Sequence, residues 1–389
     1  MRIAVVHSFY SSRVPSGENQ VVLAQVEALR AAGHEVALVA RYTDERLRRA
    51  SYPVEAALTT ATGVGPDPTA ELAAFRPDVV HVHNLFPNFG TAWLRDWPGR
   101  VVATLHNFRP MCANGYLFRD GAPCTACPSG DRWAAVRHGC FHGSRVASLP
   151  LAWRGRHGVV GDPLLARADE VVVLSERARR TYADAGVPDE HLHVVPNFVA
   201  DLPPATAGSA GDRFLLVARL TPEKGVLELV RSWPAGVGLD IVGEGELRGA
   251  IEEAAPVGVR LLGGLDNAAL RAAMPGYAGL VISSRWFEGL PTVYLEALAA
   301  GLPVLAVAGN SAADDVAEHD VGVVTGSSPT GDELRAAIAT ITAGGAALRR
   351  RAGEVFRARF TAPTWCEAIT AVYGGTAARP TVPAEPLAA

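Results

Sequence analysis

The feature that most constrains the fold is an alternation of strands and helices that runs through the chain twice. In the first half, apolar runs such as RIAVVHS (2–8), EVALVA (35–40) and ADEVVVLSE (168–176) alternate with stretches whose apolar residues recur at helical spacing. The same alternation starts again at DRFLLVARL (212–220). Continuous apolar strands separated by helices are typical of parallel sheets that helices cover on both faces. The sequence therefore predicts an α/β fold with two doubly wound, Rossmann-like domains.

The domain boundaries follow from this repeat and from local composition. We predict an N-terminal domain over residues 1–203 and a C-terminal domain over residues 204–373. The hinge is expected near 200–211, where Pro, Ala, Gly and Ser dominate. A last helix at about 361–373 is expected, and it can pack back on the first domain. The tail, 374–389, has little apolar periodicity and is predicted to be disordered.

Composition narrows the class of protein. A formal net charge of −4 argues against a sequence-nonspecific nucleic-acid binder, so no nucleic-acid partner is expected. No apolar run reaches the roughly 18 residues of a membrane span, and the first residues lack the pattern of a signal peptide. We therefore expect a cytoplasmic protein. The stretch SRVASLPLAWRGRHG (144–158) mixes basic and aromatic residues, so it is either a peripheral membrane contact or a solvated helix or loop.

Two carboxylates stand eight residues apart in WFEGLPTVYLEALAAGLP (286–303). Pro291 suits the first turn of a helix, which we expect at about 291–300, with Glu288 in the preceding loop and Glu296 inside the helix. In one continuous helix, eight residues span about 12 Å. That exceeds the roughly 5–9.5 Å between the carboxyl groups of glycosidases. The pattern therefore favours two points that hold sugar hydroxyls over an acid–base pair, with a helix start for an anion between them.

Two cations follow the first strand of the second half, in ARLTPEKG (218–225). Ligands of parallel α/β sheets bind outside the carboxyl ends of the strands, so Arg219 and Lys224 can reach the cleft that the two carboxylates face. A surface pair that caps a helix is the alternative. The combination with the carboxylates favours a diphosphate site. VGEGELRG (242–249) is by itself a weak dinucleotide fingerprint.

Together these motifs resemble the retaining glycosyltransferases of family four. The resemblance rests on R-L-x-x-E-K-G, on E-G-x-P-x-x-x-x-E, on the VGEGELR turn, on the PNF segment and on a Gly loop near the N-terminus, and it extends over residues 1 to about 374. It implies the GT-B architecture, in which two Rossmann-like domains face a central cleft. It also implies transfer of a hexose or amino sugar, with retention, from a UDP- or GDP-linked donor to an acceptor hydroxyl of a polysaccharide, a glycolipid or a secondary metabolite.

The resemblance also implies roles for single residues. The residues near the reacting centre would be Arg219, Lys224, His106 and Glu288. The residues that bind the donor would be Gly17, Gly243, Glu244, Leu290, Pro291, Thr292 and Glu296. No catalytic metal or cofactor is expected, because the two cations neutralise the diphosphate. His106 as a core histidine is the alternative, and the chain departs from the family at Ala218 and in having one glycine at Gly17 where two are common.

Four cysteines lie within an insertion at about 107–145, with the spacing C-x11-C-x2-C-x12-C. They are Cys112, Cys124, Cys127 and Cys140. The spacing suits a structural zinc site, and free thiols and disulfides are the alternatives.

Two other function classes stay open at this point. A sugar-nucleotide epimerase could use the same fold, and a noncatalytic protein organised by metal could use the cysteines. The complete set of cations and carboxylates argues against the second.

Overall fold

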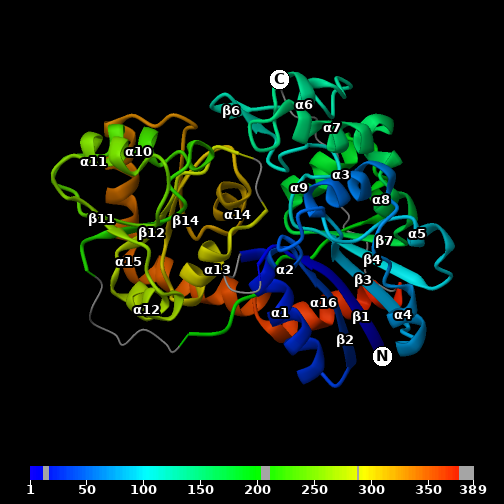
Figure 1. The fold of residues 1–389 in the computed structure, drawn as a ribbon. Coiled ribbons are helices and arrows are strands. Elements are labelled where there is room, and N and C mark those ends of the chain that lie inside the picture. The colour runs from blue at the N-terminus through cyan, green and yellow to red at the C-terminus, as the bar shows by residue number, and fades with distance from the viewer. Residues whose placement is uncertain (12–16, 203–210, 287–288, 376–389) are drawn as a thin grey trace.

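The computed structural model describes residues 1–11, 17–202, 211–286 and 289–375, and Figure 1 shows their arrangement. Most of the predicted hinge, nearly all of the predicted disordered tail and Glu288 lie outside the described residues. The predicted α/β fold with two doubly wound domains is confirmed, since two separate six-stranded sheets form. Within the described ranges, no helix combines the length and the apolar character that a membrane crossing requires.

The N-terminal sheet has the strand order β2-β1-β3-β4-β7-β8, with all neighbours parallel. Its strands are β1 (Arg2–Phe9), β2 (Glu35–Tyr42), β3 (Val79–Asn84), β4 (Arg100–Leu105), β7 (Glu170–Val173) and β8 (Leu192–Val194). Its helices are α1 (Gly17–Ala31), α2 (Thr43–Arg46), α3 (Tyr52–Thr62), α4 (Thr69–Phe75), α5 (Trp93–Asp96), α8 (Pro163–Arg167) and α9 (Glu176–Asp184), with the 3-10 turn η3 (Asp189–His191). Alternate residues of β1 enter different core clusters, so both faces of the sheet are covered.

The segment between β4 and α8, which begins with the cysteine-rich insertion, is built from short elements. These are β5 (Phe118–Arg119), β6 (Ala122–Pro123), α6 (Ala134–Arg137), α7 (Arg145–Arg154), η1 (Gly155–His157) and η2 (Val159–Gly161). β5 and β6 form a small antiparallel hairpin. The basic stretch at 144–158 is therefore mainly helical, with Ser144 capping α7 through a hydrogen bond from the amide of Ala147.

The C-terminal sheet has the order β11-β10-β9-β12-β13-β14, again with all neighbours parallel. Its strands are β9 (Phe214–Val217), β10 (Leu239–Val242), β11 (Val259–Gly263), β12 (Gly279–Ile282), β13 (Val304–Val307) and β14 (Gly322–Thr325). Its helices and turns are η4 (Pro222–Lys224), α10 (Val226–Ser232), α11 (Arg248–Ala254), α12 (Asn267–Ala273), η5 (Met274–Gly276), α13 (Thr292–Ala299), α14 (Ser311–His319) and α15 (Gly331–Arg359).

Each sheet has one point at which the strand order reverses. It lies between β1 and β3 in the first sheet and between β9 and β12 in the second. In open parallel sheets, ligands bind in the crevice outside the carboxyl ends of the strands at this point. The topology therefore directs attention to the segments that follow these four strands.

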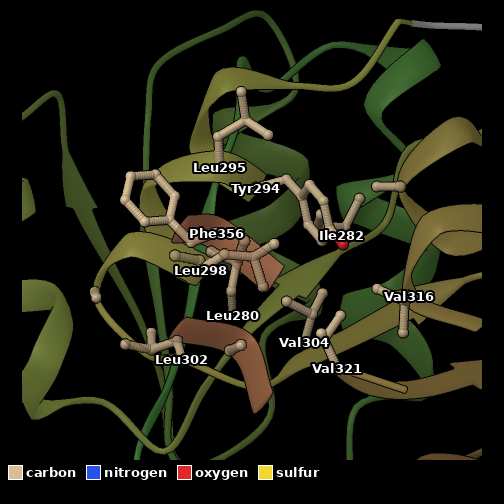
Figure 2. Close-up of a cluster of buried hydrophobic side chains, with 14 of the residues drawn as sticks. Leu280, Ile282, Tyr294, Leu295, Leu298, Leu302, Val304, Val316, Val321 and Phe356 are labelled. Atoms are coloured by element: carbon tan, nitrogen blue, oxygen red, sulfur yellow. The ribbon is translucent and has the colours of Figure 1, made fainter. Parts of the chain in front are cut away.

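The core beneath the second sheet fixes the position of α13, as Figure 2 shows. Tyr294, Leu295 and Leu298 are fully buried against β12, β13 and α15. The hydroxyl of Tyr294 donates a hydrogen bond of 2.6 Å to Asp315, which also pairs with Arg359 at 2.7 Å. The polar side of α13 is thereby held at the carboxyl edge of the sheet.

The two halves are joined by the last helix and by direct contacts. The helix α16 (Ala362–Gly374) crosses back to the first sheet, where it packs beside α1, and the hydroxyl of Tyr373 lies 2.7 Å from Nδ1 of His81. On the opposite side, Arg177 of α9 pairs with Asp314 of α14 through two contacts of 2.7 Å. These contacts set the two carboxyl edges facing one another.

Candidate active site

Arg219 and Lys224 lie in the segment that follows β9, at the reversal point of the second sheet. Lys224 ends the turn η4, and Gly225, with a φ of 64°, leads into α10. The hydroxyl of Ser283, which follows β12, donates a hydrogen bond of 2.7 Å to the carbonyl of Lys224. The two strands at the reversal point thus hold this segment from both sides.

Two aromatic rings bring the cations into the space between the sheets. Nζ of Lys224 lies 5.2 Å from the ring centre of Trp286, and the guanidinium of Arg219 lies 5.9 Å from that of Tyr116. The rings of Tyr116 and Trp286 meet edge to face at 4.8 Å. Tyr116 belongs to the insertion of the first half, so the pair bridges the two halves. The sequence did not indicate a role for either ring, because no local pattern predicts that Tyr116 and Trp286 are in contact.

Lys224 is also the only lysine of the chain, among 36 lysines and arginines. An ammonium is a compact point charge, whereas guanidinium is a planar fork. The segment after β9 thus contains a type of cation that the chain uses nowhere else.

The turn after β10 packs against the same segment. A side chain at Gly243, which has a φ of 144°, would lie 1.8 Å from the carbonyl oxygen of Ala218, so only glycine fits there. The amide of Leu220 donates to the carbonyl of Glu244 at 2.9 Å. The side chain of Glu244 is largely exposed and pairs with Arg248 at 2.9 Å. In the described structure this carboxylate therefore forms an ion pair with the first residue of the helix α11 that follows.

The helix α13 begins at Thr292, with Pro291 as its N-cap. A proline cap has no side-chain acceptor, and the amide of Tyr294 donates to the carbonyl of Pro291 at 3.0 Å, so the amides of Thr292 and Val293 are the ones that can meet an anion. Glu296 lies in the second turn and is only 7% exposed. Oε1 of Glu296 accepts a hydrogen bond of 3.0 Å from Asn267 of α12, and burial raises the pKa of this carboxyl. Leu290 is buried in the core below.

His106 follows β4 and is half-buried. Its Nε2 lies 2.9 Å from Nδ1 of His83, which is itself fully buried. Burial, together with the nearby His7 and His81, lowers the pKa of His106 to about 3, so the ring is neutral near pH 7. It can exchange hydrogen bonds with a sugar, but it adds no charge. Gly17 is the first residue of α1, and a side chain there would meet no atom within 4 Å.

The sequence-based reasoning missed a polar cluster at the reversal point of the first sheet. Nδ2 of Asn84, at the end of β3, donates to Oε1 of Glu18 in the first turn of α1 at 3.2 Å and to the hydroxyl of Tyr10 at 3.4 Å. Asn107 also donates to Glu18, and Arg109 lies nearby. Burial is the main cause that raises the pKa of Glu18 to about 7. The adjacent pocket is lined by Asn84, His106, Asn107 and Arg109.

The four clustered cysteines line one small cavity inside the insertion. All four are free thiols, so the disulfide alternative finds no support. Burial raises the pKa of Cys127 to about 11 and also raises that of Cys140. Within the part of the chain that the structure describes, no three His, Cys, Asp or Glu side chains are arranged as ligands of a metal ion.

Both halves of the chain match family models of glycosyltransferases. The model described as Glycosyltransferase Family 4 matches residues 15–201, and the model described as Glycosyl transferases group 1 matches residues 207–359. No curated protein matches the chain.

Solved structures share the whole architecture at low sequence identity. Sucrose-phosphate synthase from Thermosynechococcus elongatus has a TM-score of 0.66 and 18% identity, over 96% of this chain and 98% of that chain. Anabaena HepE in complex with UDP has a TM-score of 0.61 and 16% identity, over 96% and 100% of the two chains. AviGT4, a glycosyltransferase involved in avilamycin A biosynthesis, has a TM-score of 0.57 and 19% identity, over 96% and 97%.

The fold and the two family models define the chain as a glycosyltransferase of GT-B architecture. Within that class it belongs to the family-four type. The predicted family and enzyme class are confirmed. The E-x7-E motif itself is not, because Glu288 lies outside the described residues.

Proposed function

We propose that this glycosyltransferase moves a hexose or an amino sugar from a UDP- or GDP-linked donor to an acceptor hydroxyl, with retention of anomeric configuration. The observation that carries the proposal is the position of Arg219 and Lys224 at the reversal point of the second sheet, against the Tyr116–Trp286 pair. A diphosphate leaving group needs such fixed positive charge. HepE, which has the same fold, forms complexes with UDP and with UDP-glucose, so UDP-linked donors are the first to test.

In the proposed reaction, the bond between the anomeric carbon and the diphosphate oxygen breaks, and the acceptor oxygen bonds to the same face of that carbon. The acceptor's proton passes to the departing phosphate oxygen, so no strong base is needed.

Arg219 and Lys224 would stabilise the negative charge that develops on the diphosphate. The amides at the start of α13 would bind a phosphate, and Glu296 would accept hydrogen bonds from the ribose hydroxyls. Glu288 would hold hydroxyls of the transferred sugar, and His106 would face them from the first sheet. The turn at Gly243–Glu244 and the loop at Gly17 would border the diphosphate.

A donor screen tests this assignment. Ligands that bind only the folded state stabilise it by mass action, by about 2.7 kcal/mol at a hundredfold excess over Kd. We expect UDP- or GDP-sugars to raise Tm by several degrees, and nucleotide release to require an acceptor. Conversion of the donor to an epimeric nucleotide sugar without any acceptor would instead establish the epimerase. No shift with any nucleotide sugar would contradict both.

We further propose that the acceptor hydroxyl is received by the Glu18–Asn84 cluster. The cluster lies at the reversal point of the first sheet, where a ligand is expected, and beside the pocket that His106 lines. A carboxylate backed by amides is suited to hydrogen bonds from sugar or polyol hydroxyls. Hydroxyl-rich acceptors are therefore the class that this surface fits.

Substitution Glu18→Gln should separate the effect on the acceptor from the effect on folding. The ionised carboxylate accepts hydrogen bonds best, so the acceptor KM of the wild type should rise as pH falls through about 7, and the variant should have a high KM without this pH dependence. The raised pKa favours the protonated folded state, so the carboxyl's contribution to stability is complete below its ordinary pKa of 4.5 and is lost as pH rises through about 7. The variant should thus exceed the wild type in unfolding free energy at about pH 8, by about 2–3 kcal/mol.

Steady-state kinetics in acceptor and in donor at several pH values, together with chemical denaturation, measure both effects. An unchanged acceptor KM in Glu18→Gln would rule out the acceptor assignment. The donor KM is measured alongside, and the assignment requires the acceptor KM to change more than the donor KM, because the carboxylate of Glu18 contacts Asn84 at the end of β3.

We propose that the cysteine cluster is a structural zinc site. The convergence of Cys112, Cys124, Cys127 and Cys140 on one cavity and their spacing support this, although binding requires the side chains to turn toward a common centre. We expect about one zinc per chain by elemental analysis, and a loss of thermal stability after chelation. Metal-free protein with an unchanged Tm after chelator treatment would leave four free thiols as the correct description.

A further inference from the structure

The helix α7 (Arg145–Arg154) exposes an apolar stripe to solvent. Val146, Leu149 and Trp153 follow one another at intervals of three and four residues, and 82%, 48% and 46% of their surfaces are exposed. The opposite side of the same helix, including Leu151 and Ala152, is buried in the small core of the insertion. A surface helix normally presents polar residues outward. This outward stripe therefore needs an explanation that packing among the described residues does not provide.

Elements that neighbour α7 carry further exposed apolar side chains. The helices α3 and α6 both pack against α7, and all three gather at one end of the first domain in Figure 1. Further large apolar side chains are exposed on α3, directly before α6 and in η2, and these are Val54, Leu58, Trp133 and Val160. Patches of this kind on a monomer mark an interaction site. We call the stripe and these four residues the α7 surface.

The α7 surface is basic although the protein is acidic. Residues 132–161 contain five arginines and three histidines and no aspartate or glutamate, in a chain whose formal net charge is −4. Asp131 and Asp162, which flank this stretch, pair with Arg137 and Arg154. Arg145 and Arg156 form no ion pair within the described ranges, and the guanidinium of Arg156 stacks on the ring of Trp153 at 4.3 Å. Exposed apolar groups, tryptophan rings and arginines without an ion pair thus occur together at this end of the first domain.

We propose that the α7 surface binds the headgroup region of an anionic phospholipid bilayer, with α7 lying in the plane of the interface. Tryptophan prefers this depth, apolar side chains enter the acyl boundary, and each arginine near an anionic surface contributes about 1 kcal/mol. A second copy of this chain fits less well, because a twofold interface would set the same arginines against each other. The charge of the surface selects the bilayer over a self-interface.

The orientation of the enzyme follows from this contact. A cavity of about 200 Å³ lies beneath α7, and its lining includes Arg109, Arg132 and Arg154. Arg109 and Arg154 also line the pocket beside His106. The bilayer would therefore adjoin the side on which the acceptor enters. This consequence rests on the proposed function, whereas the bilayer contact itself does not.

Vesicle cosedimentation of the full chain tests the contact without any activity measurement. We expect binding to vesicles of equimolar phosphatidylglycerol and phosphatidylcholine at low salt, weak binding to phosphatidylcholine alone, and release by salt. The double variant Leu149→Gln/Trp153→Gln should lower the partition coefficient at least about tenfold, since it removes two apolar anchors. Both side chains are exposed, so Tm should stay within about 2 °C of the wild type.

The control variant Val257→Gln/Leu265→Gln changes two exposed apolar residues of the second domain and should bind vesicles as the wild type does. Failure of the wild type to bind anionic vesicles would overturn the proposal, and so would equal binding by the α7 variant. Equal binding to both lipid compositions would remove the electrostatic argument and overturn it as well. Self-association that the α7 variant abolishes, without vesicle binding, would identify a second copy as the true partner.

Discussion

Substitution Lys224→Ala should lower kcat/KM for sugar transfer by about 10²–10³-fold, the usual cost of removing one group that stabilises developing charge. The ammonium lies over the Trp286 ring, and Ser283 holds the backbone carbonyl of Lys224, so both the side chain and the main chain of this residue are positioned before a donor arrives. Its removal leaves Arg219 as the nearest positive charge identified in this segment. We expect most of the loss in kcat, because the charge on the diphosphate grows as the glycosidic bond breaks.

Two comparisons make this result specific. Arg231→Ala removes an exposed cation from α10, the helix that follows Lys224, and should leave kcat/KM within about twofold of the wild type. Lys224→Arg retains the charge but not the compact shape, and should recover part of the activity. Since the chain has no other lysine, reductive methylation modifies only this side chain and the terminal amine, and a bound nucleoside diphosphate should protect it. Full activity of Lys224→Ala would contradict the site assignment.

Substitution Glu296→Ala should raise the donor KM by about 10–150-fold, because hydrogen bonds to a charged group contribute about 1.5–3 kcal/mol. The carboxylate is buried on α13, where the surrounding core holds it rigid. A buried carboxyl whose pKa is raised does not favour folding when it is ionised. The unfavourable burial of an ionised carboxylate is explained if this carboxylate binds a ligand.

Glu296→Gln distinguishes that role from a structural one. Glutamine can still accept the hydrogen bond from Asn267, so the free protein should be as stable as the wild type or more so at neutral pH. Donor affinity should nevertheless fall, because the amide accepts fewer hydrogen bonds from vicinal hydroxyls. Thermal denaturation with and without donor measures both quantities. A Glu296→Gln protein that is destabilised but binds donor normally would show that the carboxylate supports the fold alone.

The sequence indicated where the candidate residues of the second half lie in the fold better than it did for those of the first half. Arg219 and Lys224 directly follow an apolar strand, and Glu296 lies in a helix whose start Pro291 indicates. The local sequence pattern was therefore sufficient to place these three residues in the fold. The pairing of Glu18 with Asn84 depends on β1 and β3 being neighbours, although β2 lies between them in the chain. Strand order is a property of tertiary packing, and no short-range pattern contains it.

Contacts between the halves were also beyond local pattern. Tyr116 meets Trp286 across 170 residues of sequence, and the hydroxyl of Tyr373 reaches His81 from the other end of the chain. The stretch at 144–158 could be described by composition, but its exposed stripe became visible only when the helix showed which side is buried. The residue types involved are common in proteins, and the contacts join residues that are far apart in the sequence.

Calorimetric titration of UDP into the wild type and into Lys224→Ala tests the central claim most directly, since it needs neither the acceptor nor the transferred sugar. We expect one UDP site per chain in the wild type, and a Kd at least about tenfold higher in the variant because a charged contact to the diphosphate is lost. GDP replaces UDP if it proves to be the tighter ligand in the same titration. Absence of binding by either nucleotide, or equal Kd values for the two proteins, would contradict a nucleotide-sugar site at the end of β9.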